Sequence, residues 1–175
     1  MKFSILATVP LLAFAAAYPS VIEERATDNT KVILSGIKTL ETDITALDTQ
    51  VKANPVNVIN VQNAEQKVEK DITAIDNNVK SSSVVTAAES TQVYNEIKNN
   101  LQPKINTVLN DLVANKAKFS GVKSIVKTDL TKLNDQTGTL GKDFIAKAQG
   151  TAKTQAPALI SAIQNKFKTA IAAFA

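Results

Sequence analysis

Two nearly identical stretches of the chain carry the side chains best suited to chemistry. ETDITALDTQVK runs from Glu41 to Lys52, and EKDITAIDNNVK runs from Glu69 to Lys80, 28 positions later. In both copies Glu, Thr, Asp and Lys stand at i, i+4, i+7 and i+11, which places them on one helical face. We call this face the stripe, and its members are Glu41, Thr45, Asp48, Lys52, Glu69, Thr73, Asp76 and Lys80. An oxygen-rich face of this kind could hold a hard cation or a hydrolytic carboxylate pair.

The remaining composition argues against both uses. The chain has no His and no Cys, so a Ser-His-Asp triad, a thiol nucleophile and a thiolate metal site are excluded. It also lacks G-x-S-x-G, a P-loop, G-x-G-x-x-G and an EF-hand-like loop. The stripe is therefore expected to be a solvated flank with charge pairing along the helix. We predict a protein that is not an enzyme and that binds no metal and no cofactor.

The charge pattern does not indicate a nucleic-acid site. The formal net charge is +4, but Lys is interleaved with Asp and Glu, and aromatic residues make up only 5% of the chain. Nucleic-acid surfaces combine clustered cations with aromatic stacking platforms. The sequence therefore predicts a mixed-charge surface and no nucleic-acid partner.

Aliphatic residues beside the stripe recur at steps of three and four, which is typical of amphipathic helices packed together. The same periodicity, with capping residues, prolines and glycines as boundaries, predicts five helices. They cover 27–54, 57–80, 84–118 with a kink at Pro103, and 122–149, and the last one starts within 151–157. Ser81–Ser83 is expected to supply an N-cap, and Pro157 to stand in a first turn. The predicted fold is all-α, an antiparallel bundle of about five long amphipathic helices.

The N-terminal segment reads as a secretory signal peptide. Lys2 precedes a mostly apolar stretch that ends in Ala15–Ala17, a small-residue cleavage pattern. The expected organisation is a signal peptide over 1–17, a short leader over 18–26 and a helical-bundle domain over 27–175. We therefore predict a secreted, extracellular protein without a transmembrane segment.

The rows of aliphatic residues along the helices, which we call the apolar seams, are the remaining candidates for function. Three uses of these seams stay open. They could form an ordinary core, line a cavity for an acyl chain, or open onto an apolar surface. Gly138 and Gly141 would either admit a close neighbour or weaken their helix, and Glu65, which interrupts one seam, is placed at an edge where it reaches water. The candidate lipid-binding residues are Ile37, Leu40, Ile44, Leu47, Ile72, Ile75, Thr91, Tyr94, Leu109, Leu112, Leu133, Thr137, Leu140, Phe144, Ile163 and Phe167.

Four segments carry a resemblance to a known family. They are VILSGIKTLETDITALDTQVKA at 32–53, LQPKINTVLNDLVANKAKF at 101–119, TDLTKL at 128–133 and FKTAIAAFA at 167–175. With the signal peptide, this pattern resembles the fungal hydrophobic surface-binding protein A family, which includes the cell-wall galactomannoprotein antigens.

The resemblance implies a secreted helical bundle that adsorbs to hydrophobic surfaces or encloses fatty acids between its helices. It also implies recruitment of a secreted hydrolase as a partner, and association with the cell wall. The alternative from another class is a structural cell-wall mannoprotein or antigen with a dry core and no ligand.

Overall fold

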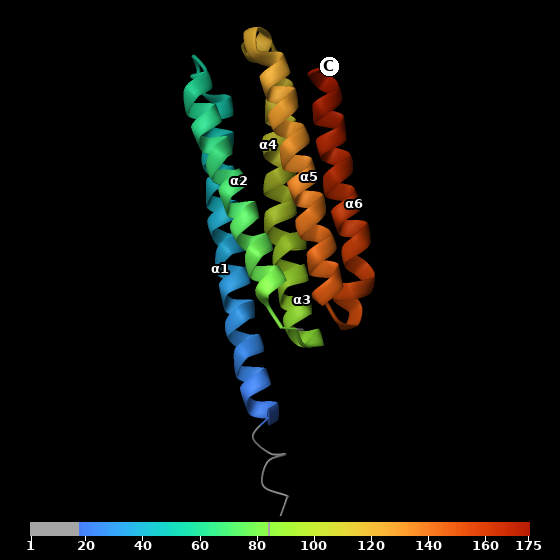
Figure 1. Cartoon of the computed structure of the whole chain (residues 1–175). Coiled ribbons are helices and arrows are strands. Elements are labelled where there is room, and N and C mark those ends of the chain that lie inside the picture. The colour runs from blue at the N-terminus through green and yellow to red at the C-terminus, as the bar shows by residue number, and fades with distance from the viewer. Residues whose placement is uncertain (1–17, 84) are drawn as a thin grey trace, which may run out of the picture.

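The computed structural model describes residues 18–83 and 85–175, and every regular element within them is helical. The elements are α1 (Tyr18–Lys52), α2 (Val58–Ser81), α3 (Ala87–Glu96), the π-helix η1 (Ile97–Leu101), α4 (Gln102–Ala114), the 3₁₀-helix η2 (Lys116–Val122), α5 (Lys123–Lys147) and α6 (Gly150–Ala173). Since α3, η1 and α4 form one column, the chain makes five columns that alternate in direction (Figure 1). The predicted all-α bundle is confirmed.

The first helix is longer than predicted. It begins at Tyr18 and not at Thr27 or Asp28, so the expected leader over 18–26 is helical. Pro19 is compatible with this start because a first-turn residue needs no intrahelical N–H partner. The predicted signal peptide, 1–17, lies outside the described residues.

The caps of α2 and α3 follow local side-chain chemistry. Asn57 Oδ1 accepts from the backbone N–H groups of Ile59 at 3.0 Å and Asn60 at 3.3 Å, so the predicted start of α2 is confirmed. The predicted Ser81–Ser83 cap for the next helix is wrong. Thr86 is the cap, because it forms a reciprocal capping box with Glu89.

Pro103 deforms its column without breaking it. The five residues of η1 precede it, and the Gln102 N–H donates to the Ile97 carbonyl, one residue farther back than in an α-helix. A π turn relieves the clash between a proline ring and the preceding turn while the column continues. The predicted 84–118 helix therefore contains a π segment, and it ends in a 3₁₀ turn that includes Ser120 and Gly121.

The last helix also starts earlier than expected. Its first residue is Gly150, at φ +61°, whereas the predicted start lay within 151–157. A Cβ at Gly150 would lie 2.9 Å from the Ala87 Cβ, so glycine permits both the backbone conformation and the approach of α3. Pro157 lies inside α6 and not in its first turn.

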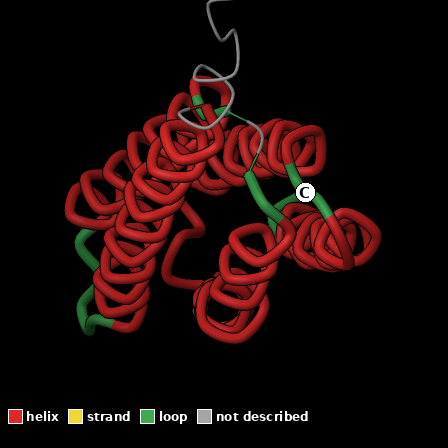
Figure 2. Tube along the Cα trace, turned by 90° about the horizontal axis from the view of Figure 1, so that it is seen from below, coloured by secondary structure: helices red, strands yellow, loops and turns green. Residues whose placement is uncertain are grey.

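The columns pack as a ring around one apolar core. In order, α1 packs on α2, α2 on α5, α5 on α6, α6 on α3 and α4, and α4 on α1 (Figure 2). The pairs α1–α4 and α2–α5 are therefore parallel neighbours that are distant in sequence. Phe119 of η2 and Phe174 close the upper end in an edge-to-face contact with ring centroids 6.4 Å apart.

Two glycines bring α5 and α6 together. Gly138 and Gly141 are buried, and an added Cβ would lie 2.5 Å from Gln164 Nε2 and 2.6 Å from Ile160 Cδ1, respectively. Of the two roles considered for these glycines, close approach of a neighbouring helix is the one observed.

Candidate functional site: an apolar cavity inside the bundle

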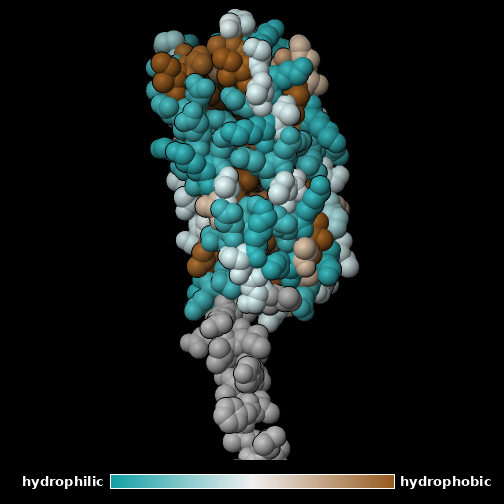
Figure 3. Space-filling view, viewed as in Figure 1, coloured by the Kyte–Doolittle hydropathy of each residue, from teal (hydrophilic) through white to brown (hydrophobic). Residues whose placement is uncertain are grey.

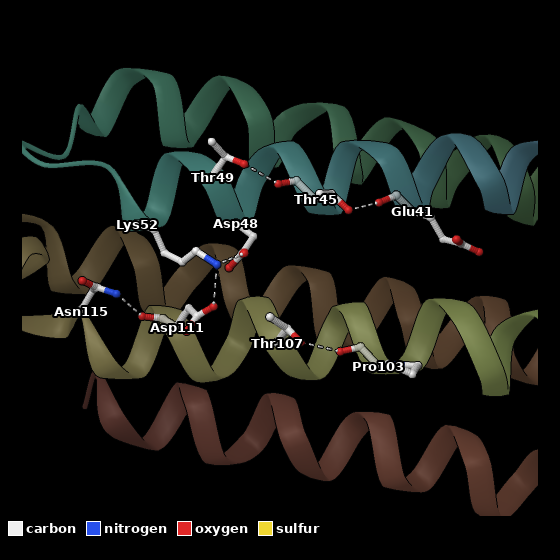
Figure 4. Close-up of polar contacts among 9 residues, drawn as sticks. All are labelled: Glu41, Thr45, Asp48, Thr49, Lys52, Pro103, Thr107, Asp111 and Asn115. Atoms are coloured by element: carbon white, nitrogen blue, oxygen red, sulfur yellow. Dashed lines mark hydrogen bonds and ion pairs between the residues drawn. The ribbon is translucent and has the colours of Figure 1, made fainter.

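The stripe joins helices and does not form a reaction centre. Lys104 Nζ lies 3.0 Å from Glu41 Oε2, which links α4 to α1. Higher on the same interface, Lys52 Nζ lies 2.7 Å from Asp48 Oδ2 and 3.4 Å from Asp111 Oδ2 (Figure 4). The second copy repeats these links between α2 and α5.

The stripe hydroxyls are used within their own helices. Thr45 Oγ1 donates to the Glu41 carbonyl at 2.8 Å, and Thr73 Oγ1 donates to the Glu69 carbonyl at 2.9 Å. The expected charge pairing is present, but the predicted solvated flank is only half right. Glu41 is 8% exposed and contacts another helix, because the stripe lies at the parallel helix–helix interfaces.

A narrow cavity of about 150 Å³ runs along the interior of the bundle. On α1 its wall extends from Ile33 to Val51, which at 1.5 Å per residue corresponds to about 27 Å. Apart from four polar residues, the part of the wall that the described residues form consists of aliphatic residues, phenylalanine, alanine and glycine. The cavity is therefore long, thin and apolar, which is a shape suited to an extended hydrocarbon chain.

Most of the predicted site residues lie on this wall. These are Ile37, Leu40, Ile44 and Leu47 on α1, Ile72 and Ile75 on α2, Leu109 and Leu112 on α4, Leu133, Thr137, Leu140 and Phe144 on α5, and Ile163 and Phe167 on α6. The helical periodicity thus selected one continuous surface. Ligand binding by these residues remains a prediction.

Thr91 and Tyr94 do not line the cavity. The Thr91 hydroxyl donates to the Ala87 carbonyl at 2.8 Å within α3. Tyr94 is buried in the core, and Lys98 Nζ lies 5.6 Å from its ring centroid. Val93 lines the cavity on α3, and Ile97 and Leu101, which were predicted on the same apolar face as Tyr94, also line it.

The cavity reaches the surface between the upper parts of α2 and α5. Gln62 and Ile125 line it and are both exposed. Together with Val61, Glu65, Val126 and Asp129 they form what we call the mouth. The deep end, at Ile33, Val79 and Phe144, is buried.

Glu65 is the least expected member of the mouth. The residue is 8% exposed, and its Oε1 atom has no hydrogen-bond partner among the residues that the structure describes. Burial, a hydrogen bond with Glu69 and repulsion from Glu69 and Asp129 raise the pKa of Glu65 to about 8, and Lys132 opposes this rise. Burial likewise raises the pKa of Asp129. At neutral pH the mouth therefore contains a protonated carboxyl group.

The expectation that Glu65 reaches water is wrong. The residue keeps its place on the apolar seam of α2, and α5 covers it. Its interruption of the seam was the signal that could have identified it as a wall residue. Asp129 carried no such signal, because the partner helix that places it at the mouth is distant in sequence.

Apolar side chains are exposed around the mouth. Ile59, near the start of α2, is 68% exposed, and Ile125, near the start of α5, is 46% exposed. Figure 3 shows an apolar patch at this upper end of the molecule, whereas the middle of the same face is mostly hydrophilic. Within the described ranges, 18–83 and 85–175, no helix is long and apolar enough to cross a membrane.

A family model described as hydrophobic surface binding protein A matches residues 30–146. The chain belongs to this family. The resemblance seen in the sequence is thereby confirmed, and so is the expectation of a family that binds hydrophobic material. No curated protein matches the chain.

Solved structures of other proteins share the fold. AfMP4p, a fungal mannoprotein solved with palmitic acid, is 32% identical, with a TM-score of 0.79 over 83% of this chain and 99% of its own. Ligand binding domain 1 of the Penicillium marneffei MP1 protein, solved with arachidonic acids, is 13% identical, with a TM-score of 0.79 over 84% and 99% of the two chains. Domain 2 of MP1, also solved with arachidonic acids, is 13% identical, with a TM-score of 0.74 over 83% and 95%. At 13% identity the likeness concerns the fold alone.

Proposed function

We propose that this protein binds a long-chain lipid of the fatty-acid type between its helices. The observation that carries the proposal is the apolar cavity, whose wall follows α1 for about 27 Å. The palmitic acid held by AfMP4p supports the same ligand class, since that protein shares both the family fold and 32% of its residues. The protein acts by holding its ligand and not by converting it.

The cavity must widen to admit an acyl chain. Its volume, about 150 Å³, is below the ~300–1,000 Å³ of common small-molecule sites. The mouth between α2 and α5 is the place for this widening, because its side chains are the least buried part of the wall. Binding then separates two helices that are joined at the surface by Glu69 and Lys132.

Titration of the delipidated protein with a fluorescent fatty acid tests the proposal, with palmitic acid as competitor. We expect saturable binding with one site per chain. Leu133→Trp, which fills the cavity from a buried wall position, should abolish it. Val32→Trp, which adds the same side chain at a position 51% exposed, is the matched control and should bind normally. Absence of saturable binding to the folded wild-type protein would contradict the proposal.

A structural role with a dry core is the second candidate, and the small cavity volume favours it. Apolar cavities near 150 Å³ can remain empty in folded proteins. A dry core predicts that added fatty acid leaves the melting temperature unchanged. A bound lipid raises it with increasing ligand concentration, because the ligand stabilises only the folded state.

We also propose that the protein acts outside the cell, on the strength of the signal peptide predicted over 1–17 and of its family. Association with the cell wall is part of this proposal. A secreted hydrolase as partner rests on the resemblance alone. Pull-down of secreted proteins on lipid-coated beads, with and without this protein, tests it.

A further inference from the structure

The polar part of the cavity wall is acidic. Of the described residues, those that line the cavity with polar side chains are Gln62, Glu65, Asp129 and Thr137, and none of the described lining residues is basic. Lys132, the cation that acts on the Glu65 carboxyl group, is 56% exposed, and its Nζ lies 2.6 Å from Glu69 Oε2. A carboxylate head group entering this end would therefore meet two carboxyl groups, while this lysine is already paired.

The polar atom that the cavity wall offers to a ligand is Glu65 Oε1. Glu65 is 8% exposed, and its Oε1 atom is buried and has no hydrogen-bond partner among the described residues. A carboxyl oxygen accepts hydrogen bonds through its lone pairs. Glu65 Oε1 is therefore a buried, free acceptor in a residue that lines the cavity.

We infer that Glu65 is the head-group subsite of the cavity, and that it accepts a hydrogen bond from a neutral donor such as the hydroxyl of a long-chain alcohol. A buried acceptor without a partner is costly, and a hydroxyl donor removes this cost. A carboxylate has no proton to donate, loses its hydration and is repelled by Asp129. This inference rests on the proposed function, since it names the lipid head group that the same cavity prefers.

The geometry leaves room for the tail below Glu65. The α2 wall continues from Glu65 to Val79, 14 residues farther, which corresponds to about 21 Å along the helix. The α2 wall residues between them are Val68, Ile72 and Ile75, all buried and aliphatic. A head group at Glu65 thus places the hydrocarbon chain against the apolar part of the wall.

Three ligands with twelve-carbon chains test the inference by displacement of a fluorescent fatty acid at pH 7. Dodecan-1-ol offers a neutral donor, dodecanoate a charge without a donor, and methyl dodecanoate neither. We expect dodecan-1-ol to bind about three- to tenfold more tightly than the other two, which is the usual contribution of one buried neutral hydrogen bond. Binding of dodecanoate should strengthen as the pH approaches 4–5, where a carboxylic acid begins to carry a proton to donate.

Variants at Glu65 distinguish the effect of its hydrogen-bond acceptor on ligand preference from the effect of its packing in the cavity wall. Glu65→Leu should remove the preference for the alcohol over the ester. Glu65→Gln keeps a carbonyl acceptor, so it should retain that preference, and its amide N–H should improve dodecanoate binding. The control is Glu41→Leu, the same change at a glutamate that is also 8% exposed but lies off the cavity wall, and it should leave the ranking unchanged.

The outcomes distinguish this inference from the proposed function. Saturable binding of all three ligands with dodecanoate equal to or tighter than dodecan-1-ol at pH 7 overturns the head-group subsite and leaves lipid binding intact. An unchanged ranking in folded Glu65→Leu protein does the same. If none of the three ligands displaces the probe and the probe itself does not bind saturably, the proposed function fails and the inference with it.

Discussion

Lys132 Nζ lies 2.6 Å from Glu69 Oε2, and this contact joins α5 to α2 beside the mouth of the cavity. The first sequence copy has the same contact, with Lys104 Nζ 3.0 Å from Glu41 Oε2 between α4 and α1. Both pairs span 63 residues, so the four-heptad repeat produces two equivalent parallel interfaces. The copies differ on the cavity wall, where Glu65 stands four heptads after Ile37.

The two equivalent lysines should differ in their response to pH. Lys132→Met removes a cation that interacts with Glu65, Glu69 and Asp129, whereas Lys104→Met removes the cation paired with Glu41. Above its pKa of about 8, the Glu65 carboxyl group adds a negative charge beside Lys132. We therefore expect the urea midpoint of Lys132→Met to fall further below wild type at pH 9 than at pH 6. The deficit of Lys104→Met should be the same at both pH values, and equal behaviour of the two variants would contradict a special role for Lys132.

The stability of the wild-type protein should fall as the pH rises through the titration of Glu65. Its ordinary pKa of 4.5 applies to the unfolded chain, and about 8 applies to the folded one. Between these values the folded state binds more protons, so the contribution is fully present below 4.5 and lost above 8. The slope approaches about 1.4 kcal/mol per pH unit. Urea unfolding at intervals from pH 5 to 9 measures it.

Glu65→Gln is the matched control for this titration because it keeps the shape and removes the proton. Its unfolding free energy should be nearly flat between pH 7 and 8. A slope should persist below pH 7, because burial and a hydrogen bond with Asp43 raise the pKa of Asp71 to about 6, and stability conferred by Asp71 is also lost as the pH rises. A slope in Glu65→Gln as steep as in wild type between pH 7 and 8 would refute the assignment to Glu65.

The helices and most of the cavity wall were predictable because helical periodicity is local information. On α1 the predicted residues Ile37, Leu40, Ile44 and Leu47 are all buried. Steps of three and four bring such residues to one face whatever the partner helix is. For this reason the pattern identified residues of the cavity wall although the order in which the helices pack around the core was unknown.

Features that depend on a helix distant in the chain could not be predicted from the sequence. Glu65 looked like an edge residue, because nothing near it in the chain shows that α5 covers it. The position of Tyr94 off the cavity wall was missed for a similar reason, since the orientation of α3 in the ring depends on its contacts with α1 and α6. Pro103 indicated a distortion of its helix, but either a kink or a π segment can relieve the clash that a proline causes, so the sequence did not distinguish them.

Gly141→Ala should destabilise the bundle although alanine is the better helix former. The new Cβ would lie 2.6 to 2.9 Å from three carbons of Ile160, so α5 and α6 would have to separate. Overpacking of this kind costs about 1–3 kcal/mol, and the gain in helix propensity, about 1 kcal/mol, offsets only part of it. Urea unfolding should show a lower free energy of unfolding for Gly141→Ala.

Two further variants assign the effect of Gly141→Ala to Ile160. Gly121→Ala introduces a Cβ with no heavy atom within 4 Å and should be nearly neutral. Gly141→Ala combined with Ile160→Ala should be more stable than the sum of the two single changes predicts, because the clash is absent in the pair. Strict additivity would show that the two side chains do not meet.

Ile59→Ser should weaken adsorption to hydrophobic beads while leaving ligand binding unchanged. Ile59 is 68% exposed near the start of α2, and it does not line the cavity. Removing this apolar area should lower the adsorption constant about three- to tenfold, since burying one such side chain contributes about 1.5–3 kcal/mol when complete.

Val32→Ser, at a position 51% exposed on the lower part of α1, is the control and should adsorb like wild type. Depletion onto beads and fluorescent fatty-acid titration, measured on the same samples, separate the two activities. Equal losses in both variants would mean that adsorption does not use the mouth.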